Sequence, residues 1–196
     1  EIIEAKVGKP LLPKHWNELE TMTISYGHGI SITPLHLAVG YAMLANGGRL
    51  VKPTLLEDMK TNLSPRVISK EVADTSLAML RGVVIDGTAS IADISGYFVG
   101  GKTGTADKPS AQGGYDKEKN ITSFASIFPI NDPKYVLVVT LDEPQDTSGP
   151  EPKRTAGWTA VPVSAEIIAR VAPLLGLRPI FDNQSTVGVT LSSWQE

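Results

Sequence analysis

The chain has 196 residues, 41% of them hydrophobic and 20% charged, and its net charge is −3 at pH 7. This length suits one domain with a sizeable core, and the charge gives no sign of a nucleic-acid or anionic-membrane partner. The absence of cysteine excludes disulfides, thiolate metal sites and a cysteine nucleophile.

The N-terminal segment is expected to contain little regular structure. Within residues 1–24, Pro10 and Pro13 interrupt any helix, and Trp16 is expected to act as a hydrophobic anchor. Residues 25–32 alternate glycines with residues that favour extended backbone, which predicts a β-prone segment.

Two helices are predicted from their start and stop signals. Thr33 followed by Pro34 is typical of an N-cap and a first helical position, and the helix is expected to end at Asn46. Ser69 is the expected N-cap of a second helix over residues 70–85, where most apolar residues recur at helical spacing.

Three strands follow, at residues 97–105, 121–130 and 134–142. The Asn-Asp-Pro turn at 131–133 predicts that the last two strands are antiparallel neighbours. The last strand carries a continuous apolar run, which is typical of a central strand. Residues 107–120, between the first two strands, are expected to form a polar loop.

A final helix is predicted at about residues 159–175, with Pro162 in its first turn and Pro173 near its end. Its apolar stripe can pack on the sheet. Helices, three sequential antiparallel strands and a packed helix give an α+β order. Residues 177–196 are expected to form a polar tail.

The most informative motif is Lys102-Thr103-Gly104, in the first predicted strand. Strand alternation places Lys102 and Gly104 on one face and Thr103 and Thr105 on the other. A lysine and a hydroxyl can hold an anionic ligand, and a glycine lets another backbone approach closely. Lys-Thr-Gly is an element of penicillin-binding proteins and serine β-lactamases.

The same chemistry requires a Ser-x-x-Lys nucleophile, which this sequence does not contain. No serine has a lysine three residues later, and no Ser-x-Asn element is present. The chain also begins with Glu rather than Met. We therefore expect a piece of a longer protein, which carries part of an active site.

A phosphate-binding loop is the alternative interpretation, because residues 96–103 match the pattern G-x-x-x-x-G-K-[ST]. That site requires a helix directly after the loop. Here Tyr97, Phe98 and Val99 favour a sheet, and the residues after Gly104 are poor helix formers. The sequence therefore disfavours a nucleotide site.

A longer pattern, over about residues 22–175, resembles class B penicillin-binding proteins. Its parts are Ser-Tyr-Gly-His-Gly-Ile at 25–30, Thr-Pro-Leu at 33–35, Ala-Asn-Gly-Gly at 45–48, Gly-Thr-Ala at 87–89, Gly-Lys-Thr-Gly-Thr-Ala at 101–106 and Ala-Val-Pro-Val at 160–163. The resemblance implies the β-lactamase/transpeptidase-like fold, with residues 1–176 as the C-terminal part of the transpeptidase domain. Tyr-Gly-His-Gly resembles the division, or septal, subtype.

The resemblance also implies roles for four residues. Lys102 would lie beside the serine of the absent Ser-x-Asn element, favouring proton movement and attracting the substrate carboxylate. Thr103 would donate its hydroxyl proton to that carboxylate, and Gly104 would let the ligand lie along the strand. The backbone N–H of Thr105 would form one half of the oxyanion hole, and the absent nucleophile the other half.

The implied reaction is acyl transfer from a D-Ala-D-Ala stem peptide to a neighbouring amine during septal peptidoglycan synthesis, with β-lactams as inhibitors. No metal or organic cofactor takes part, and His15, His28 and His36 are too scattered to predict a metal site. The implied location is the periplasmic side of a bacterial inner membrane. The implied partners are the N-terminal part of the same protein and membrane proteins of the division complex.

The chain alone is expected to be inactive, because its nucleophile is missing. A non-catalytic module that binds penicillin or another protein is the alternative function.

Overall fold

The computed structural model describes residues 8–56 and 64–181, so the predicted tail beyond residue 181 lies outside the described residues. The elements are helices α1 (Glu18–Ser25), α2 (Pro34–Ala45) and α3 (Lys70–Ile85), the short 3-10 helix η1 (Ser90–Ala92), strands β1 (Gly100–Pro109), β2 (Tyr115–Phe128) and β3 (Tyr135–Asp142), and helix α4 (Ala160–Leu174). In these two ranges, no helix is long and apolar enough to cross a membrane.

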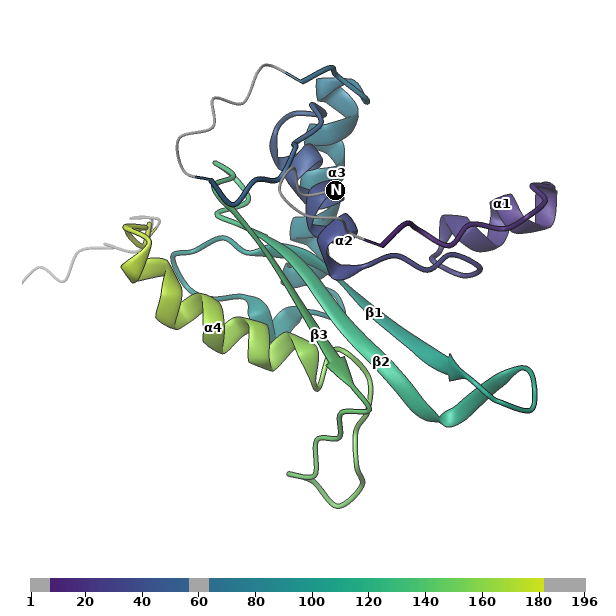
Figure 1. Ribbon diagram of the computed structural model, residues 1–196. Helices are drawn as coiled ribbons and strands as arrows, with labels where there is room; N and C mark the ends of the chain where they lie inside the picture. The colour runs from purple at the N-terminus through teal and green to yellow at the C-terminus, as the bar shows by residue number, and fades with distance from the viewer. Residues whose placement is uncertain (1–7, 57–63, 182–196) are drawn as a thin grey trace, which may run out of the picture.

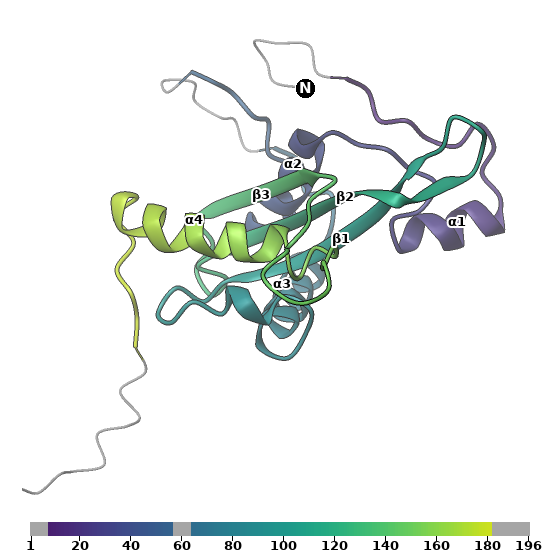
Figure 2. The same ribbon diagram turned by 90° about the horizontal axis from the view of Figure 1, so that it is seen from below.

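The three strands form one antiparallel sheet in the order β1-β2-β3, with helices against both faces (Figures 1 and 2). Helix α4 packs on β2 and β3 from one side, whereas α2 and α3 pack from the other. The prediction of an α+β fold with a three-stranded antiparallel sheet is confirmed.

The core lies between α4 and the sheet. Phe124 of β2 is directly opposite Val139 of β3, and both are buried together with Val161 and Ile168 of α4. Because side chains alternate along a strand, the neighbours of Phe124 in β2 point to the opposite face, toward α2 and α3.

The predicted starts of α2 and α3 are confirmed by their N-caps. Thr33 Oγ1 accepts a hydrogen bond from the backbone N–H of His36 (3.2 Å), and Ser69 Oγ accepts one from Val72 (3.1 Å). Each cap satisfies a backbone donor that has no partner within its helix.

The expectation of irregular structure throughout residues 1–24 is wrong for α1. Asn17 caps this helix, accepting two backbone N–H bonds of 2.9 and 3.2 Å. Trp16 is 57% exposed and does not anchor the segment. The predicted β-prone segment after α1 contributes only an isolated bridge between Ser31 and Leu11.

The strand boundaries differ from the prediction in two places. β1 begins at Gly100, three residues late, because Phe98 has a φ of 45°, which is incompatible with a strand. Most of the polar loop predicted at residues 107–120 belongs instead to β1 and β2, which form a long hairpin. Its turn is closed by a hydrogen bond from Ser110 N–H to Gly114 O (3.0 Å).

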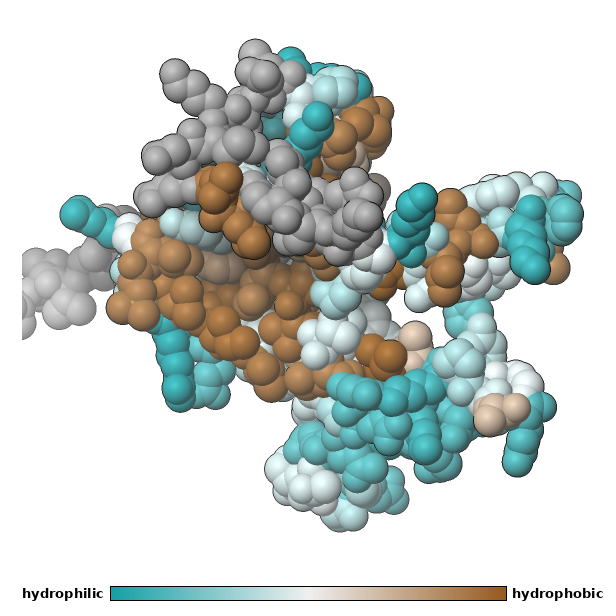
Figure 3. Space-filling view, in the orientation of Figure 1, coloured by the Kyte–Doolittle hydropathy of each residue, from teal (hydrophilic) through white to brown (hydrophobic). Residues whose placement is uncertain are grey.

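Strand β3 lies at one edge of the sheet, although its sequence predicted a central strand. No strand in the described ranges pairs with its outer edge. Its apolar residues from Tyr135 to Val138 are only half-buried. Apolar side chains gather over α4 and β3 in Figure 3, so this side of the molecule is markedly apolar.

Candidate active site on strand β1

The Lys-Thr-Gly motif lies in the middle of β1. This strand pairs with β2 on one side only, and no described strand covers its other edge. The backbone groups along that edge are therefore open to another chain or a ligand.

Two glycines of β1 differ in their surroundings. A Cβ on Gly101 would lie 2.6 Å from the Phe124 ring and 2.6 Å from the Ala125 carbonyl oxygen, so Gly101 is required for packing. A Cβ on Gly104 would meet nothing within 4 Å. Packing against the described residues therefore does not explain Gly104, and they leave the space beside it free.

The side chains of the motif alternate as predicted. Thr103 is opposite Phe124, and Thr105 is opposite Thr122, whose hydroxyl bonds to Thr159 at the start of α4 (3.0 Å). Thr103 and Thr105 thus lie on the α4 face, whereas Lys102 lies on the opposite one.

Thr103 and Thr105 line one cleft of about 440 Å³, between β1, the turn after α3 and the loop before α4. The described residues that line it are Gly87, Thr88, Ser90, Ile91, Thr103, Thr105, Thr155, Ala156, Gly157 and Trp158.

Each of these two threonines has a partner inside the cleft. Thr103 Oγ1 lies 2.7 Å from Thr88 Oγ1, and either hydroxyl can donate in this pair. Thr105 Oγ1 accepts a hydrogen bond from the backbone N–H of Ala156 (3.0 Å).

The ammonium group of Lys102 lies beside the Thr103 hydroxyl. Its Nζ donates to the Thr103 carbonyl oxygen (2.9 Å) and lies 3.4 Å from Thr103 Oγ1. The lysine therefore folds back along the strand, and its charge lies next to the cleft hydroxyls. A cation and two hydroxyls at one place can bind a carboxylate.

The aromatic ring of Trp158, which lines the cleft, contacts a second cation. Lys153 Nζ is 3.2 Å from the centroid of the Trp158 ring, which is 47% exposed. The backbone of Lys153 is held by paired hydrogen bonds to Asp146 (2.8 and 3.0 Å). Hydrogen bonds from Ser148 hold the pKa of the Asp146 carboxyl below its ordinary value.

A second cavity, of about 490 Å³, adjoins the C-terminal end of the motif. Thr105 lines it, together with His28 and Tyr115, whose rings are 5.6 Å apart. The Tyr-Gly-His-Gly segment and the Lys-Thr-Gly strand, far apart in the sequence, thus border the same space.

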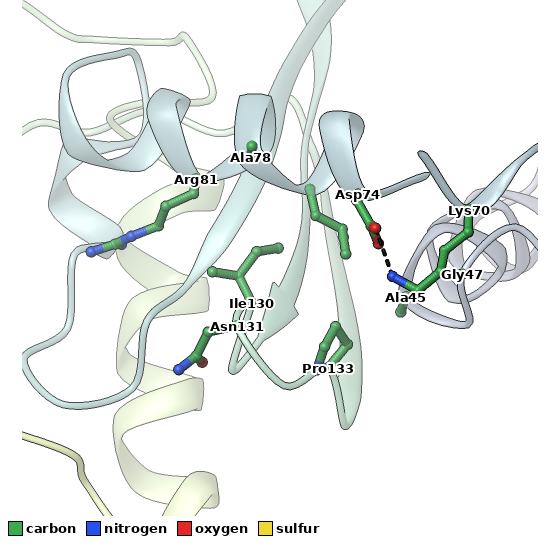
Figure 4. Close-up of a pocket in the computed structure, with 10 residues that line it drawn as sticks. Ala45, Gly47, Lys70, Asp74, Ala78, Arg81, Ile130, Asn131 and Pro133 are labelled. Atoms are coloured by element: carbon green, nitrogen blue, oxygen red, sulfur yellow. Dashed lines mark hydrogen bonds and ion pairs between the residues drawn. The ribbon is translucent and has the colours of Figure 1, made fainter. Parts of the chain in front are cut away.

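A third cavity, also of about 490 Å³, lies between α3, the end of α2 and the β2–β3 turn (Figure 4). Lys70 and Asp74 form an ion pair of 2.6 Å at its side, and Asn131 and Pro133 come from the turn. None of the four residues from Lys102 to Thr105 lines this cavity, so it is separate from the candidate site.

The sequence pointed to Lys102, Thr103, Gly104 and Thr105 but gave no role to their partners. Thr88 and Ala156 reach the cleft from other parts of the chain. The only available signal was the Gly-Thr-Ala sequence at 87–89, which belonged to the resemblance without an assigned function.

Comparison with known proteins shows the family of this chain. The family model "Penicillin binding protein transpeptidase domain" matches residues 3–169. The probable peptidoglycan D,D-transpeptidase FtsI of Caulobacter vibrioides is 34% identical over 182 residues, which are 87% of this chain and 31% of that protein.

Solved structures agree with the sequence match. The transpeptidase domain of penicillin-binding protein 3 from Burkholderia pseudomallei superposes with a TM-score of 0.74 at 34% identity, covering 88% of this chain and 51% of that chain. Penicillin-binding protein 3 from Mycobacterium tuberculosis, complexed with aztreonam, superposes with a TM-score of 0.71 at 28% identity. This match covers 87% of this chain and 42% of that chain. The chain thus spans about a third of its curated relative and about half of these solved chains, and it belongs to the family of penicillin-binding protein transpeptidase domains.

Proposed function

We propose that this chain is the C-terminal part of the transpeptidase domain in a class B peptidoglycan D,D-transpeptidase of the division type. Residues 1–176 belong to that domain. The FtsI name of the Caulobacter relative and the Tyr-Gly-His-Gly segment support the division type. The observation that carries the proposal is the cluster of Thr103 and Thr105 hydroxyls beside the Lys102 ammonium on an open strand edge.

In the proposed reaction, a serine from another part of the protein attacks the amide carbonyl of a D-Ala-D-Ala stem peptide. The C–N bond breaks, D-Ala leaves with a proton on its nitrogen, and the acyl group remains as a serine ester. The amine of a neighbouring stem then attacks this ester, forming the cross-link and passing one of its own protons to the serine oxygen.

Four residues of β1 receive roles in this reaction. Lys102 and the Thr103 hydroxyl bind the terminal carboxylate of the stem peptide, and Lys102 also assists proton transfer. The space beside Gly104 admits the peptide backbone as an added strand, and the backbone N–H of Thr105 stabilises the oxyanion. The open outer edge of β1 supports this placement, because an added strand needs unpaired backbone groups.

β-Lactams are proposed to bind at the same place. Penicillin-binding protein 3 from Mycobacterium tuberculosis, 28% identical to this chain, was solved with aztreonam and, in a second structure, with ampicillin. The carboxylate of a penicillin would take the position of the stem-peptide carboxylate beside Thr103.

We place the protein on the outer side of a bacterial inner membrane, with the division complex as its partner, because cross-linking uses peptidoglycan outside the cytoplasm. An alkaline phosphatase fusion, which is active only outside the cytoplasm, tests this location.

A non-catalytic binding module is the second candidate, because the 196 residues contain no Ser-x-x-Lys element. Fluorescent penicillin separates the two functions. We expect the full-length protein to give a stoichiometric labelled band on a denaturing gel, and this chain alone to give none.

A full-length variant with the Ser-x-x-Lys serine replaced by alanine is the control and should remain unlabelled. An unlabelled full-length wild-type protein would support the binding module. Labelling of the isolated chain would contradict its proposed dependence on a nucleophile from elsewhere.

A further inference from the structure

The Thr88–Thr103 pair is held from both sides by backbone packing. Thr88 lies in the turn that follows α3. A Cβ on Gly87 would lie 2.7 Å from the Val83 carbonyl oxygen, so this turn lies directly against the end of the helix. On the other side, a Cβ on Gly157 would lie 2.8 Å from the Thr88 carbonyl oxygen. The Thr88 hydroxyl is thus presented to Thr103 by a backbone with little freedom to move.

Hydrogen-bond directions in the cleft follow from the number of protons available. A lysine ammonium can only donate, so Lys102 Nζ, 3.4 Å from Thr103 Oγ1, occupies an acceptor position on that oxygen. A hydroxyl has two acceptor positions and one proton. When Thr88 also donates to Thr103, both acceptor positions are filled, and the Thr103 proton must point to a third partner.

A carboxylate as the third partner fixes the directions of these hydrogen bonds. An ionised carboxylate only accepts hydrogen bonds, so Thr103 must donate to it, and Thr88 must then donate to Thr103. Thr105 also accepts a hydrogen bond that leaves its own proton free to be donated. A backbone N–H, that of Ala156, donates to its oxygen at 3.0 Å and leaves the Thr105 proton for the cleft.

We propose that Thr88 is a positioning residue, which makes Thr103 a proton donor and thereby tunes the cleft for ligands that carry a carboxylate. This inference rests on the proposed function, because it assigns the carboxylate to the transpeptidase ligand. Thr88 acts through Thr103 and needs no contact with the ligand.

The test uses the full-length protein and the second-order rate constant of acylation by benzylpenicillin and by its methyl ester, which lacks the negative charge. Thr88→Val removes the hydroxyl and keeps the shape. For benzylpenicillin, we expect a loss of about three- to tenfold, the effect of one neutral hydrogen bond. For the methyl ester the rate should be nearly unchanged. Thr88→Ser keeps the hydroxyl and should restore the benzylpenicillin rate.

A double variant checks that Thr88 acts through Thr103. Thr88→Val added to Thr103→Val should cause no further loss, since coupled residues are not additive. Thr140→Val is the matched control. It removes one hydroxyl of another pair, 3.2 Å from Ser123 Oγ on the opposite face of the sheet, and should leave both rates unchanged.

Equal losses on both penicillins, full additivity in the double variant, or an unchanged rate in Thr88→Val would each overturn the inference while the proposed function stands. A wild-type protein that benzylpenicillin does not acylate would overturn the proposed function and this inference with it. Thr88→Ala gives the same test if the valine variant does not fold.

Discussion

The side chain of Thr103 is only half-buried, and its hydroxyl lies in the cleft. In the full-length protein, we expect Thr103→Val to reduce the rate of acylation by β-lactams about tenfold to a hundredfold, because a hydrogen bond to a charged group contributes about 1.5–3 kcal/mol. The melting temperature should change little, because valine keeps the shape and the strand preference of threonine. An unchanged rate with a large fall in melting temperature would show that Thr103 serves packing.

Gly104 and Gly101 form a matched pair for separating binding from folding. Gly104→Ala places its methyl group in free space and should leave the free energy of unfolding nearly unchanged, while hindering a ligand backbone beside β1. Gly101→Ala forces its methyl group against Phe124 and should cost about 1–3 kcal/mol of stability.

Urea unfolding and penicillin acylation, measured on both variants, check this prediction. A Gly104→Ala protein that is stable and fully active would refute the ligand path along β1.

The sequence could predict the strand residues of the site but not their partners. Lys102 to Thr105 are consecutive, so strand alternation alone places them on their faces. Thr88 and Ala156 reach Thr103 and Thr105 only through tertiary packing, at separations of 15 and 51 residues. No local pattern carries that information.

Among the elements, α2 contains Tyr41, a titratable residue whose burial makes the free energy of unfolding depend on pH. Burial raises the pKa of Tyr41 from 10.0 to about 12. The unfolded chain therefore releases this proton first, and the stabilising effect, complete below pH 10, is lost as pH rises toward 12.

We expect the free energy of unfolding to fall over this range by about 1–2 kcal/mol more in the wild type than in Tyr41→Phe, allowing for partial solvent screening. Urea titrations at pH 9 and pH 11.5 measure the difference. Equal losses in the two proteins would mean that Tyr41 does not contribute.

Element boundaries were predictable where local capping chemistry sets them. Thr33 and Ser69 begin their helices as expected. Asn17 offered the same signal for α1, but none of the residues in that helix is buried, so no apolar stripe marked it. The outer part of the β1–β2 hairpin is largely exposed, and its polar sequence lacked the alternation that reveals a half-buried strand.

For the molecule as a whole, the open edge of β3 is a liability in the isolated chain. An apolar strand with unpaired backbone groups promotes strand pairing between copies. We expect the isolated chain to associate as its concentration rises, and Thr140→Lys, an exposed charge on β3, to suppress this.

Sedimentation velocity over a concentration series measures the effect. Thr75→Lys, the same change at an exposed position of α3, is the control and should associate like the wild type. Equal association of all three proteins would exclude the β3 edge as the contact.

The long β1–β2 hairpin also offers a way to observe ligand binding without chemistry. From Thr105, β1 continues for about 13 Å to Pro109, at about 3.3 Å per residue, before the exposed turn that contains Gln112. Because the chain has no cysteine, Gln112→Cys creates its single thiol for a fluorescent donor. Energy transfer to a β-lactam that carries an acceptor dye would then report occupancy of the cleft, even in a protein unable to form the acyl bond.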